Sequence, residues 1–267
     1  MKDVQKEKDY RNIPIDKVGI KNLRYPVTVQ DRENKYQQTV ANINMYVDLP
    51  HHTKGTHMSR FVEMLHIFRQ ELSYEAFSRI LNNMKTQLNA RSSHMELSFP
   101  YFIKKKAPVT GSSGLMDYSC KIIGQSDRNG KIDIVSQVEV PVSSLCPCSK
   151  EISEFGAHNQ RGIVSLKVRF KKFIWIEDLI KICEEAGSCE VFSVLKRADE
   201  KEVTERAYKN PKFVEDIARD VALKLYEDKN ILWFEVSVEN FESIHNHSAY
   251  AYISSSGIDA MRQNDLS

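Results

Sequence analysis

The sequence lacks the short motifs that mark several common enzyme families. It contains no G-x-x-x-x-G-K-[ST] phosphate loop and no G-x-G-x-x-G dinucleotide fingerprint. It also contains no HExxH, no GxSxG and no pair of CxxC motifs. These absences disfavour the usual nucleotide-binding loops, zinc protease helices and hydrolase nucleophile turns.

Long apolar runs and an excess of one charge are absent as well. The apolar runs are far too short to cross a bilayer. The opening residues, MKDVQKEKDYRN, are polar and lack the apolar centre of a secretion signal. The 38 basic and 36 acidic residues give a net charge of +2, so the chain as a whole lacks the excess of positive charge that is typical of proteins that bind nucleic acid. We therefore expect a cytoplasmic protein that binds neither nucleic acid nor membrane.

Cysteine is sparse, odd in number and irregularly spaced. The five cysteines lie at positions 120, 146, 148, 183 and 189. In a chain without a secretion signal this pattern favours free thiols over a disulfide framework. The 267 residues are 41% hydrophobic and 28% charged. A chain of this length and composition suggests about two globular domains.

The chain does contain clear period-two alternation of apolar and polar residues, which is typical of β-strands. One face of each expected strand is polar, which favours antiparallel sheets with one solvated face. The expected strands cover residues 41–49, 95–103, 115–124, 132–140, 164–170, 233–240 and 245–253.

Apolar residues at three-four spacing predict helices between these strands. The first stripe runs from Met58 to Phe68, the second follows a cap at Ser73, and the third begins at Ile176. The last helix is expected to start with Asn210 as its cap and Pro211 at its first position. Strands and helices together predict an α+β fold.

We expect the order strand, strand, helix, helix, strand, strand and then the same again, which is eight strands, seven of which have the ranges given above. The turn signal Arg128-Asn129-Gly130 separates the two repeats. We expect a flexible tail over residues 1–15, repeat units over 16–128 and 129–255, and a second tail over 256–267.

Candidate chemistry is concentrated in LCPCSKEISEFGAHNQRG, residues 145–162. A thiolate and an imidazole are both zinc ligands, so Cys146 and His158 could hold a metal. Cys146 could also be a nucleophile, or simply a packed thiol, and the spacing does not decide among these. Lys150 and Arg161 belong to the same polar loop between two strands, a place where binding residues concentrate.

Three further segments carry candidate residues. His245 and His247 lie two apart in an expected strand, so both would point the same way. They could transfer protons, or they are two ordinary histidines at the start of a strand. The acid-rich segment 196–216 offers Glu200, Glu202 and Glu205 as candidate carboxylate ligands, or is an ordinary solvated linker. Glu215 is expected to be part-buried, with either Arg219 or a guanine ring as its partner.

Together these segments resemble the prokaryotic type IB GTP cyclohydrolases. The similarity runs in order from about Asp16 to Tyr252 through KGTHMSRF, SLCPCSKEIS, GAHNQR, DEK-x-VTE-x-AY-x-NP-x-FVED and IHNHSAYA. The resemblance implies the tunnelling fold, in which each chain has two tandem ββααββ units with antiparallel sheets. These chains would assemble into a barrel-shaped homotetramer with active sites at the subunit junctions.

The resemblance also implies a reaction. GTP and water would give formate and 7,8-dihydroneopterin triphosphate, the first step of folate biosynthesis. Each site would use one divalent metal (zinc, manganese or iron) and no organic cofactor.

The roles of individual residues follow from the same resemblance. By similarity, Glu215 would anchor the guanine ring, and His245 and His247 match active-site histidines. Lys150 and Arg161 are our candidates for the triphosphate. The metal ligands would be Cys146, His158 and Glu200.

Two alternatives stay open from the sequence. One is a related tunnelling-fold enzyme that acts on a pterin or deazapurine, such as a nitrile reductase with Cys146 as nucleophile. A covalent adduct on Cys146 without bound metal would favour that enzyme. The other is a non-catalytic purine-binding module, which would bind GTP without turnover.

Overall fold

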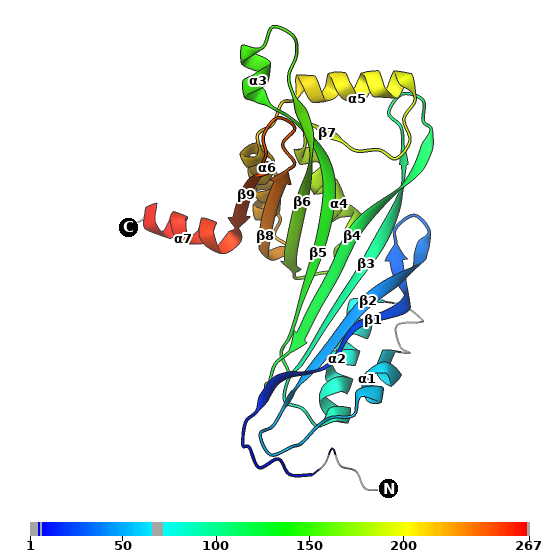
Figure 1. Cartoon of the computed structure of the whole chain (residues 1–267), viewed down its shortest axis with the longest axis vertical. Coiled ribbons are helices and arrows are strands. Elements are labelled where there is room, and N and C mark those ends of the chain that lie inside the picture. The colour runs from blue at the N-terminus through cyan, green and yellow to red at the C-terminus, as the bar shows by residue number, and fades with distance from the viewer. Residues whose placement is uncertain (1–4, 6, 66–71, 266–267) are drawn as a thin grey trace. The chain divides into compact units, whose positions relative to one another are not determined.

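The computed structural model describes residues 5, 7–65 and 72–265. Strands neighbour one another in the order β1-β2-β3-β4-β5-β6-β8-β9, and β7 pairs with β5 (Figure 1). The registers of β1 with β2, β2 with β3, β6 with β8 and β8 with β9 are antiparallel, which confirms the predicted α+β fold. The elements are β1 (Ile15–Asp31), β2 (Lys35–Leu49), α1 (Met58–Met64), α2 (Tyr74–Leu88), β3 (Ser93–Lys106), β4 (Ser113–Ser126), β5 (Ile132–Leu145), α3 (Pro147–Ile152), β6 (Asn159–Phe170), α4 (Ile176–Ala186), β7 (Cys189–Glu190), α5 (Arg197–Lys209), α6 (Val214–Glu227), β8 (Ile231–Asn240), β9 (Ala249–Ser254) and α7 (Ser255–Asp265).

Contacts within the chain define two compact units. Unit 1 contains residues 1–100 and 121–136, and unit 2 contains residues 101–120 and 137–267. The predicted boundary at Arg128-Asn129-Gly130 is a turn between β4 and β5, where Gly130 has a φ of 83°. Of the predicted tails, residues 1–4, 6, 266 and 267 lie outside the described residues, and α7 occupies most of the second.

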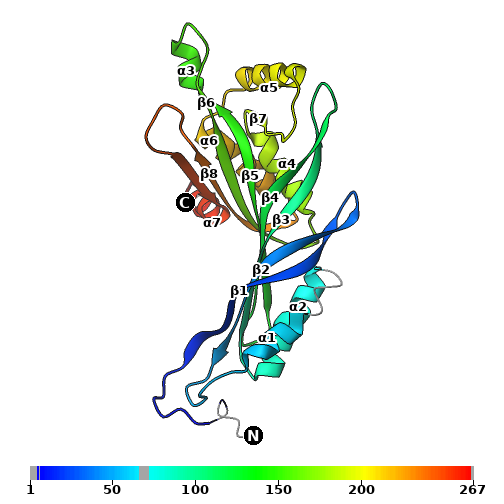
Figure 2. The ribbon, with the colours of Figure 1, turned by 45° about the vertical axis from the view of Figure 1, so that its right-hand side comes forward.

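Unit 1 buries the alternating residues that the sequence analysis selected. On β2 these are Ala41, Ile43, Met45, Val47 and Leu49. Helices α1 and α2 lie on one side of β1 and β2 in both Figure 1 and Figure 2. The predicted cap of α2 is confirmed, because Ser73 Oγ accepts the backbone N–H of Ala76 at 3.1 Å.

The first helix departs from its predicted apolar stripe. Phe61 and Leu65 are buried, but Met58 and Val62 are 41% and 39% exposed. Helix α1 is only seven residues long, so only one side of this short helix packs against the core, and its other side faces solvent. Phe68, the predicted end of this stripe, lies outside the described residues.

Unit 2 also packs helices against the apolar side of its strands, and its core is larger. Helices α4 and α6 lie on one side of β5, β6 and β8 (Figure 1). Most strand residues on the buried side are apolar, and most residues on the other side are polar. The buried strand residues are Val138, Val140, Val142, Val164, Leu166, Val168, Phe234, Val236 and Val238. All five cysteines of the chain are free thiols, as predicted.

The predicted linker before the last helix is itself a helix. Residues Arg197–Lys209 form α5, where Lys201–Glu205 and Glu202–Arg206 are ion pairs one turn apart. Alternating charges therefore mark a solvated helix in this segment, since i,i+4 pairs stabilise helices.

The predicted start of the last helix is also wrong. Asn210 is the C-terminal cap of α5, and its N–H donates to Arg206 O at 3.1 Å. Pro211 disfavours a helical conformation in the residue before it, so Asn210-Pro211 ends one helix rather than beginning the next. Helix α6 begins at Val214, and Asp216 accepts the N–H of Phe213 at 2.9 Å.

The strand predicted at 245–253 begins later, at Ala249. Residues 241–248 form a loop, and pairing with β8 starts at Asn240 and Ala249. In the described part of the chain, no helix is both long and apolar enough to cross a membrane.

Candidate functional site

Cys146 and His158 meet where β5 ends and β6 begins. The N–H of Cys146 donates to the carbonyl of His158 at 3.1 Å. Cys146 also caps α3, because its Sγ accepts the N–H of Ser149 at 3.5 Å, and Ser149 Oγ accepts the N–H of His158 at 3.2 Å. Both residues are partly exposed. The antiparallel return of the chain thus brings together the backbones of the two predicted metal ligands.

The imidazole of His158 is oriented by its neighbours. Its Nδ1 lies 3.0 Å from Gln160 Oε1 and 3.2 Å from Ser243 Oγ. When Nδ1–H donates to the amide oxygen, Nε2 keeps the lone pair that a metal ligand needs. The geometry therefore suits His158 as a donor through Nε2.

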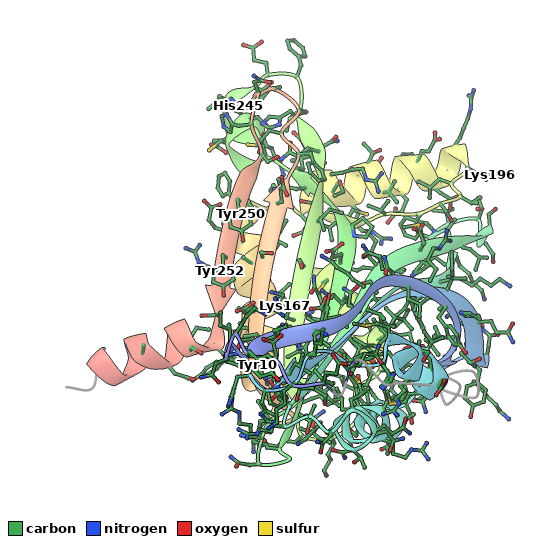
Figure 3. All side chains as sticks on the ribbon, turned by 60° about the horizontal axis from the view of Figure 1, so that its bottom comes forward. Tyr10, Lys167, Lys196, His245, Tyr250 and Tyr252 are labelled. Atoms are coloured by element: carbon green, nitrogen blue, oxygen red, sulfur yellow. The ribbon has the colours of Figure 1, made fainter. Side chains whose placement is uncertain are left out.

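The loop of residues 241–248 carries the two predicted histidines to this place. Ser243 contacts His158 directly, as above, and His245 and His247 follow two and four residues later. Both histidines are exposed, and their rings stack with centroids 5.2 Å apart and planes at 22°. Figure 3 shows His245 in this loop, beyond Tyr250 and Tyr252 of β9. They share a side as predicted, although in a loop instead of a strand.

The two predicted triphosphate residues lie on α3 and at the start of β6. Lys150 Nζ donates to the carbonyl of Tyr208 at 2.6 Å and lies 4.5 Å from the centre of the Tyr208 ring. This contact ties α3 to α5. Arg161 is exposed at the start of β6, and its carbonyl accepts the N–H of Phe241 at 2.9 Å.

Glu200 is exposed on the first turn of α5, apart from the Cys146 and His158 pair. Among the described residues, no group of three or more histidine, cysteine, aspartate or glutamate side chains is placed to hold a metal ion. The structure of the single chain therefore does not bring Glu200 to the other two predicted ligands.

The start of α5 is nevertheless fixed firmly by the residue before Glu200. The carboxylate of Asp199 accepts N–H groups of Val109, Thr110 and Lys196 at 2.9, 2.8 and 2.9 Å, and the Thr110 hydroxyl at 2.7 Å. Burial raises the pKa of Asp199, but the hydrogen bonds from Thr110, Lys196 and Val109 outweigh it and hold that pKa well below its usual range.

Glu215 is exposed, so the expectation of a part-buried carboxylate is wrong. Helix α6 turns Val214, Ile217 and Ala218 into the core. Each residue advances about 100° around a helix, which places the side chain at 215 off that stripe. The carboxylate on the first turn of α6 is therefore accessible to a ligand.

Two contact residues of this region were missed by the sequence analysis. Ser243 lies 85 positions from His158, and Tyr208 lies 58 positions from Lys150. No spacing rule links residues so far apart, because only the folded chain brings them together.

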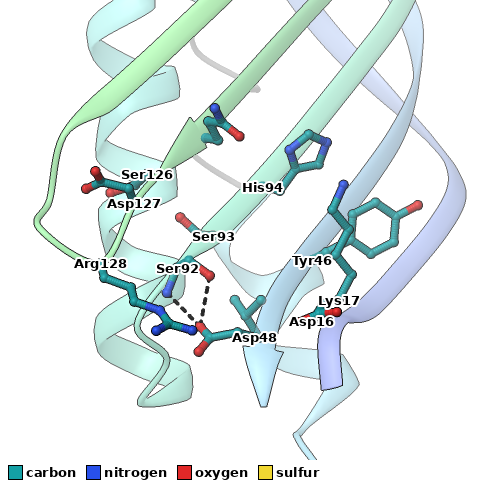
Figure 4. Close-up of a pocket in the computed structure, with 12 residues that line it drawn as sticks. Asp16, Lys17, Tyr46, Asp48, Ser92, Ser93, His94, Ser126, Asp127 and Arg128 are labelled. Carbon is teal, nitrogen blue, oxygen red and sulfur yellow. Dashed lines mark hydrogen bonds between the residues drawn. The ribbon is translucent and has the colours of Figure 1, made fainter. Parts of the chain in front are cut away.

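A pocket of about 320 Å³ lies elsewhere, in unit 1 (Figure 4). Its lining includes Tyr46, Asp48 and His94, and the rings of Tyr46 and His94 stack at 6.0 Å. Asp48 accepts the N–H and the hydroxyl of Ser92 at 2.6 and 3.1 Å. None of the site residues predicted from the sequence lines this pocket.

Next to this pocket, Glu96 forms a network that makes a testable contribution to stability. His94, Lys121 and Asn44 contact its carboxylate at 2.9, 3.0 and 3.2 Å. Burial raises the pKa of Glu96, but these hydrogen bonds outweigh it and hold the pKa at about 2.

We expect Glu96→Gln to lower the unfolding free energy at pH 7 by about 1–2 kcal/mol, after allowing for solvent screening. A carboxylate whose pKa is lowered by folding stabilises the fold at pH values above its pKa in the unfolded chain. This stabilisation is lost as the pH falls toward about 2, the pKa of Glu96 in the fold. The difference between variant and wild type should therefore shrink from pH 5 toward pH 2. Urea titrations across this range measure it, and a pH-independent difference would contradict the assignment.

Solved structures with the same fold are urate oxidases. The uricase of Arthrobacter globiformis matches with a TM-score of 0.53 and 10% identity, over 90% of this chain and 92% of that chain. The urate oxidase of Bacillus subtilis matches with a TM-score of 0.53 and 8% identity, over 89% and 97%. At these identities the likeness shows the fold, which is the tunnelling fold expected from the sequence.

Sequence relatives are much closer. The GTP cyclohydrolase FolE2 of Desulfosudis oleivorans is 67% identical over 253 residues, 95% of this chain and 97% of the relative. That of Syntrophobacter fumaroxidans is 60% identical over 253 residues, with 95% and 98% covered. A family model described as "Type I GTP cyclohydrolase folE2" matches residues 1–251. The chain therefore belongs to the type I GTP cyclohydrolase FolE2 family.

Proposed function

We propose that this chain is a type IB GTP cyclohydrolase, which converts GTP and water to formate and 7,8-dihydroneopterin triphosphate in folate biosynthesis. The proposal is carried by the 67% identity to a GTP cyclohydrolase FolE2 over nearly the whole of both chains. The local geometry supports it, because Cys146, His158 and the loop with His245 and His247 come together. The cytoplasmic location expected from the sequence remains a prediction.

The donors at β5 and β6 fit a divalent metal ion in part. Cys146 Sγ and His158 Nε2 are the sulfur and nitrogen ligands that zinc accepts, and Gln160 orients the imidazole. A carboxylate would complete the set, and Glu200 is our candidate after assembly of several chains. When bound, such a metal lowers the pKa of a coordinated water to about 7.

Glu215 would orient the guanine ring. Its exposed carboxylate can accept hydrogen bonds from the ring N1–H and the 2-amino group. Two charge-assisted hydrogen bonds fix both the position and the rotation of the purine. C8, the atom that leaves as formate, is thereby held toward the Cys146 and His158 pair.

His245 and His247 would move protons. Histidine titrates near neutrality and can both donate and accept a proton. Opening of the imidazole ring requires a proton at N7 or N9, and cleavage of the formamide requires a further transfer. The exposed, stacked pair in the 241–248 loop can supply these transfers without an organic cofactor.

Lys150 and Arg161 would contact the triphosphate. Arg161 is exposed beside the 241–248 loop and can extend toward an anion. Lys150 would have to leave the Tyr208 carbonyl, to which it now donates at 2.6 Å. The ammonium group of Lys150 would then exchange the neutral carbonyl oxygen of Tyr208 for a charged phosphate oxygen.

We also propose a homotetramer with active sites at the subunit junctions. The Cys146 and His158 pair lacks a third donor among the described residues. Exposed apolar side chains lie in the same stretch of sequence and in the 241–248 loop. Ile152 and Phe155 are 85% and 93% exposed in the same loop, and Ile244 is 65% exposed in the neighbouring loop. Clustered exposed apolar side chains mark association surfaces.

The double substitution Ile152→Ser, Phe155→Ser is expected to weaken this assembly, because it removes the apolar contact area. Sedimentation at micromolar concentration should show smaller species, and formate release should fall with them. A matched change at exposed Leu232, Leu232→Ser, serves as a control for the loss of surface hydrophobicity. An unchanged tetramer in the double variant, or a monomeric wild type, would contradict the proposal.

The overall reaction is tested directly with purified protein, GTP and manganese or zinc. We expect equal amounts of formate and of a product that becomes a fluorescent neopterin after oxidation. GTP binding without turnover under each divalent ion would favour a purine-binding module. A covalent adduct on Cys146 would favour the nitrile reductase chemistry.

A further inference from the structure

The core side of unit 2 changes from apolar to polar at one end of its strands. The buried series on β5 and on β8 both end in a polar residue immediately before the site loops: Val138, Val140, Val142 and then Ser144; Phe234, Val236, Val238 and then Asn240. Ser144 is 1% exposed and Asn240 is 2% exposed. Burying an amide and a hydroxyl is unfavourable unless both are hydrogen-bonded.

These two residues form a buried hydrogen-bonded chain that ends on the segment before α6. Asn240 Nδ2 donates to Ser144 Oγ at 3.0 Å, and Ser144 Oγ donates to the carbonyl of Lys212 at 3.0 Å. The N–H of Lys212 donates to Leu145 O at 3.0 Å. Residues 211–213 lie in neither α5 nor α6, so these bonds hold an otherwise irregular segment.

Each of the three hydrogen-bonded residues, Ser144, Lys212 and Asn240, is close in sequence to a part of the proposed active site. Ser144 precedes Cys146 by two residues, and Lys212 precedes Glu215 by three. Asn240 is the last residue of β8 and begins the connection to the 241–248 loop. The bonds therefore connect the segments that carry the metal donor, the guanine anchor and the histidines.

Gly162 of β6 restricts Asn240 to this arrangement. The two residues are paired in the register of β6 and β8. A Cβ on Gly162 would lie 2.3 Å from Asn240 Oδ1. Asn240 Oδ1 is buried and has no hydrogen-bond partner among the described residues. The amide oxygen thus fills space that only glycine leaves, and the amide nitrogen faces Ser144.

We propose that Asn240 and Ser144 are positioning residues, which set the placement of Cys146, the 241–248 loop and Glu215 relative to one another. This inference rests on the proposed function, because the residues it places are those of the GTP cyclohydrolase site. Neither residue contacts substrate in this scheme. They act by holding three segments in register, and small displacements of reacting groups are costly.

The first test compares Asn240→Ala and Ser144→Ala with a matched control, Ser255 of α7, which is hydrogen-bonded to β8. Ser255 Oγ accepts the N–H of Phe234 at 3.2 Å near the other end of β8, and Ser255 is also buried. All three variants should lower the melting temperature. Asn240→Ala and Ser144→Ala should also lower kcat by about 10–100-fold, whereas Ser255→Ala should keep kcat within about twofold. Equal kcat values for all three folded variants would overturn the proposal.

The second test uses Gly162→Ala. This substitution displaces the side chain of Asn240 but leaves residues 240 and 144 themselves unchanged, so both hydrogen-bonding side chains are still present. We expect Gly162→Ala to lower kcat as Asn240→Ala does. Gly162→Ala added to Asn240→Ala should have a smaller effect than in the wild type, because the obstructing amide is gone and only the Glu239 carbonyl, 3.1 Å from the new Cβ, remains close. Additive losses in the double variant would contradict a role for Asn240.

The third test separates positioning from catalysis. In a Cys148→Ala background, Cys146 is the one thiol outside the buried set Cys120, Cys183 and Cys189. Asn240→Ala should change the rate of Cys146 alkylation by iodoacetamide several-fold, and Ser255→Ala should not. Wild-type protein without formate release would refute the proposed function, and the alkylation rates alone would then decide the positioning proposal. Identical rates in all variants would overturn it.

Discussion

Cys146→Ala is expected to lose the bound metal and to lower formate release from GTP by at least about 100-fold. Even outer-shell partners of a metal site typically contribute 10–100-fold, so removal of a direct ligand sets a floor near that range. The fold should survive, because Cys146 is partly exposed at the cap of α3, outside the buried core. Metal content, GTP turnover with manganese and the melting temperature together measure this.

Cys148→Ala provides the matched control for that experiment. Cys148 is exposed two residues later in the same short helix, and its removal alters the loop without removing the donor beside His158. We expect its metal content and turnover to stay close to those of the wild type. Near-normal formate release by Cys146→Ala would refute Cys146 as a ligand. Equal losses in both variants would point to a disturbed loop instead.

Glu215→Gln is expected to raise the KM for GTP by about 10–100-fold, because hydrogen bonds to a charged group contribute about 1.5–3 kcal/mol. The glutamine amide keeps one acceptor but cannot match both donors of the guanine edge. Metal content should be unchanged, since Glu215 lies on α6 and outside the Cys146 and His158 pair. Steady-state kinetics and metal analysis of the same preparation measure both quantities.

A substrate comparison sharpens this prediction. Inosine triphosphate lacks the 2-amino group, so the wild type should prefer GTP and Glu215→Gln should lose much of that preference. Glu227→Gln, an exposed glutamate at the other end of α6, is the matched control and should behave as the wild type. An unchanged KM, or an unchanged preference for GTP in Glu215→Gln, would exclude Glu215 as the guanine anchor.

Local patterns in the sequence were sufficient for most of the core. Alternation on β2, β5, β6 and β8 and the stripe on α2 depend on neighbours two to four positions apart. The structure buries most of these residues as predicted, and leaves Ile132, Ile134, Phe170 and Leu88 partly exposed. The patterns failed at Asn210-Pro211. There the same dipeptide is compatible both with the end of one helix and with the approach to the next. In addition, the charged segment predicted as a linker forms helix α5.

From the sequence by itself, residue type and short spacing determined the alternating core and the α+β fold class. Resemblance to a known family supplied the candidate roles of Cys146, His158 and the histidine pair. Only the tertiary structure decided that Ser243 reaches His158, that Glu215 is exposed and that Asn240 bonds to Ser144 across 96 positions. Contacts of that kind depend on how β5, β6 and β8 align. Strand register depends on which faces of neighbouring strands are buried together and on the turns that join them, and the pattern within one strand does not show which residues of another strand lie opposite.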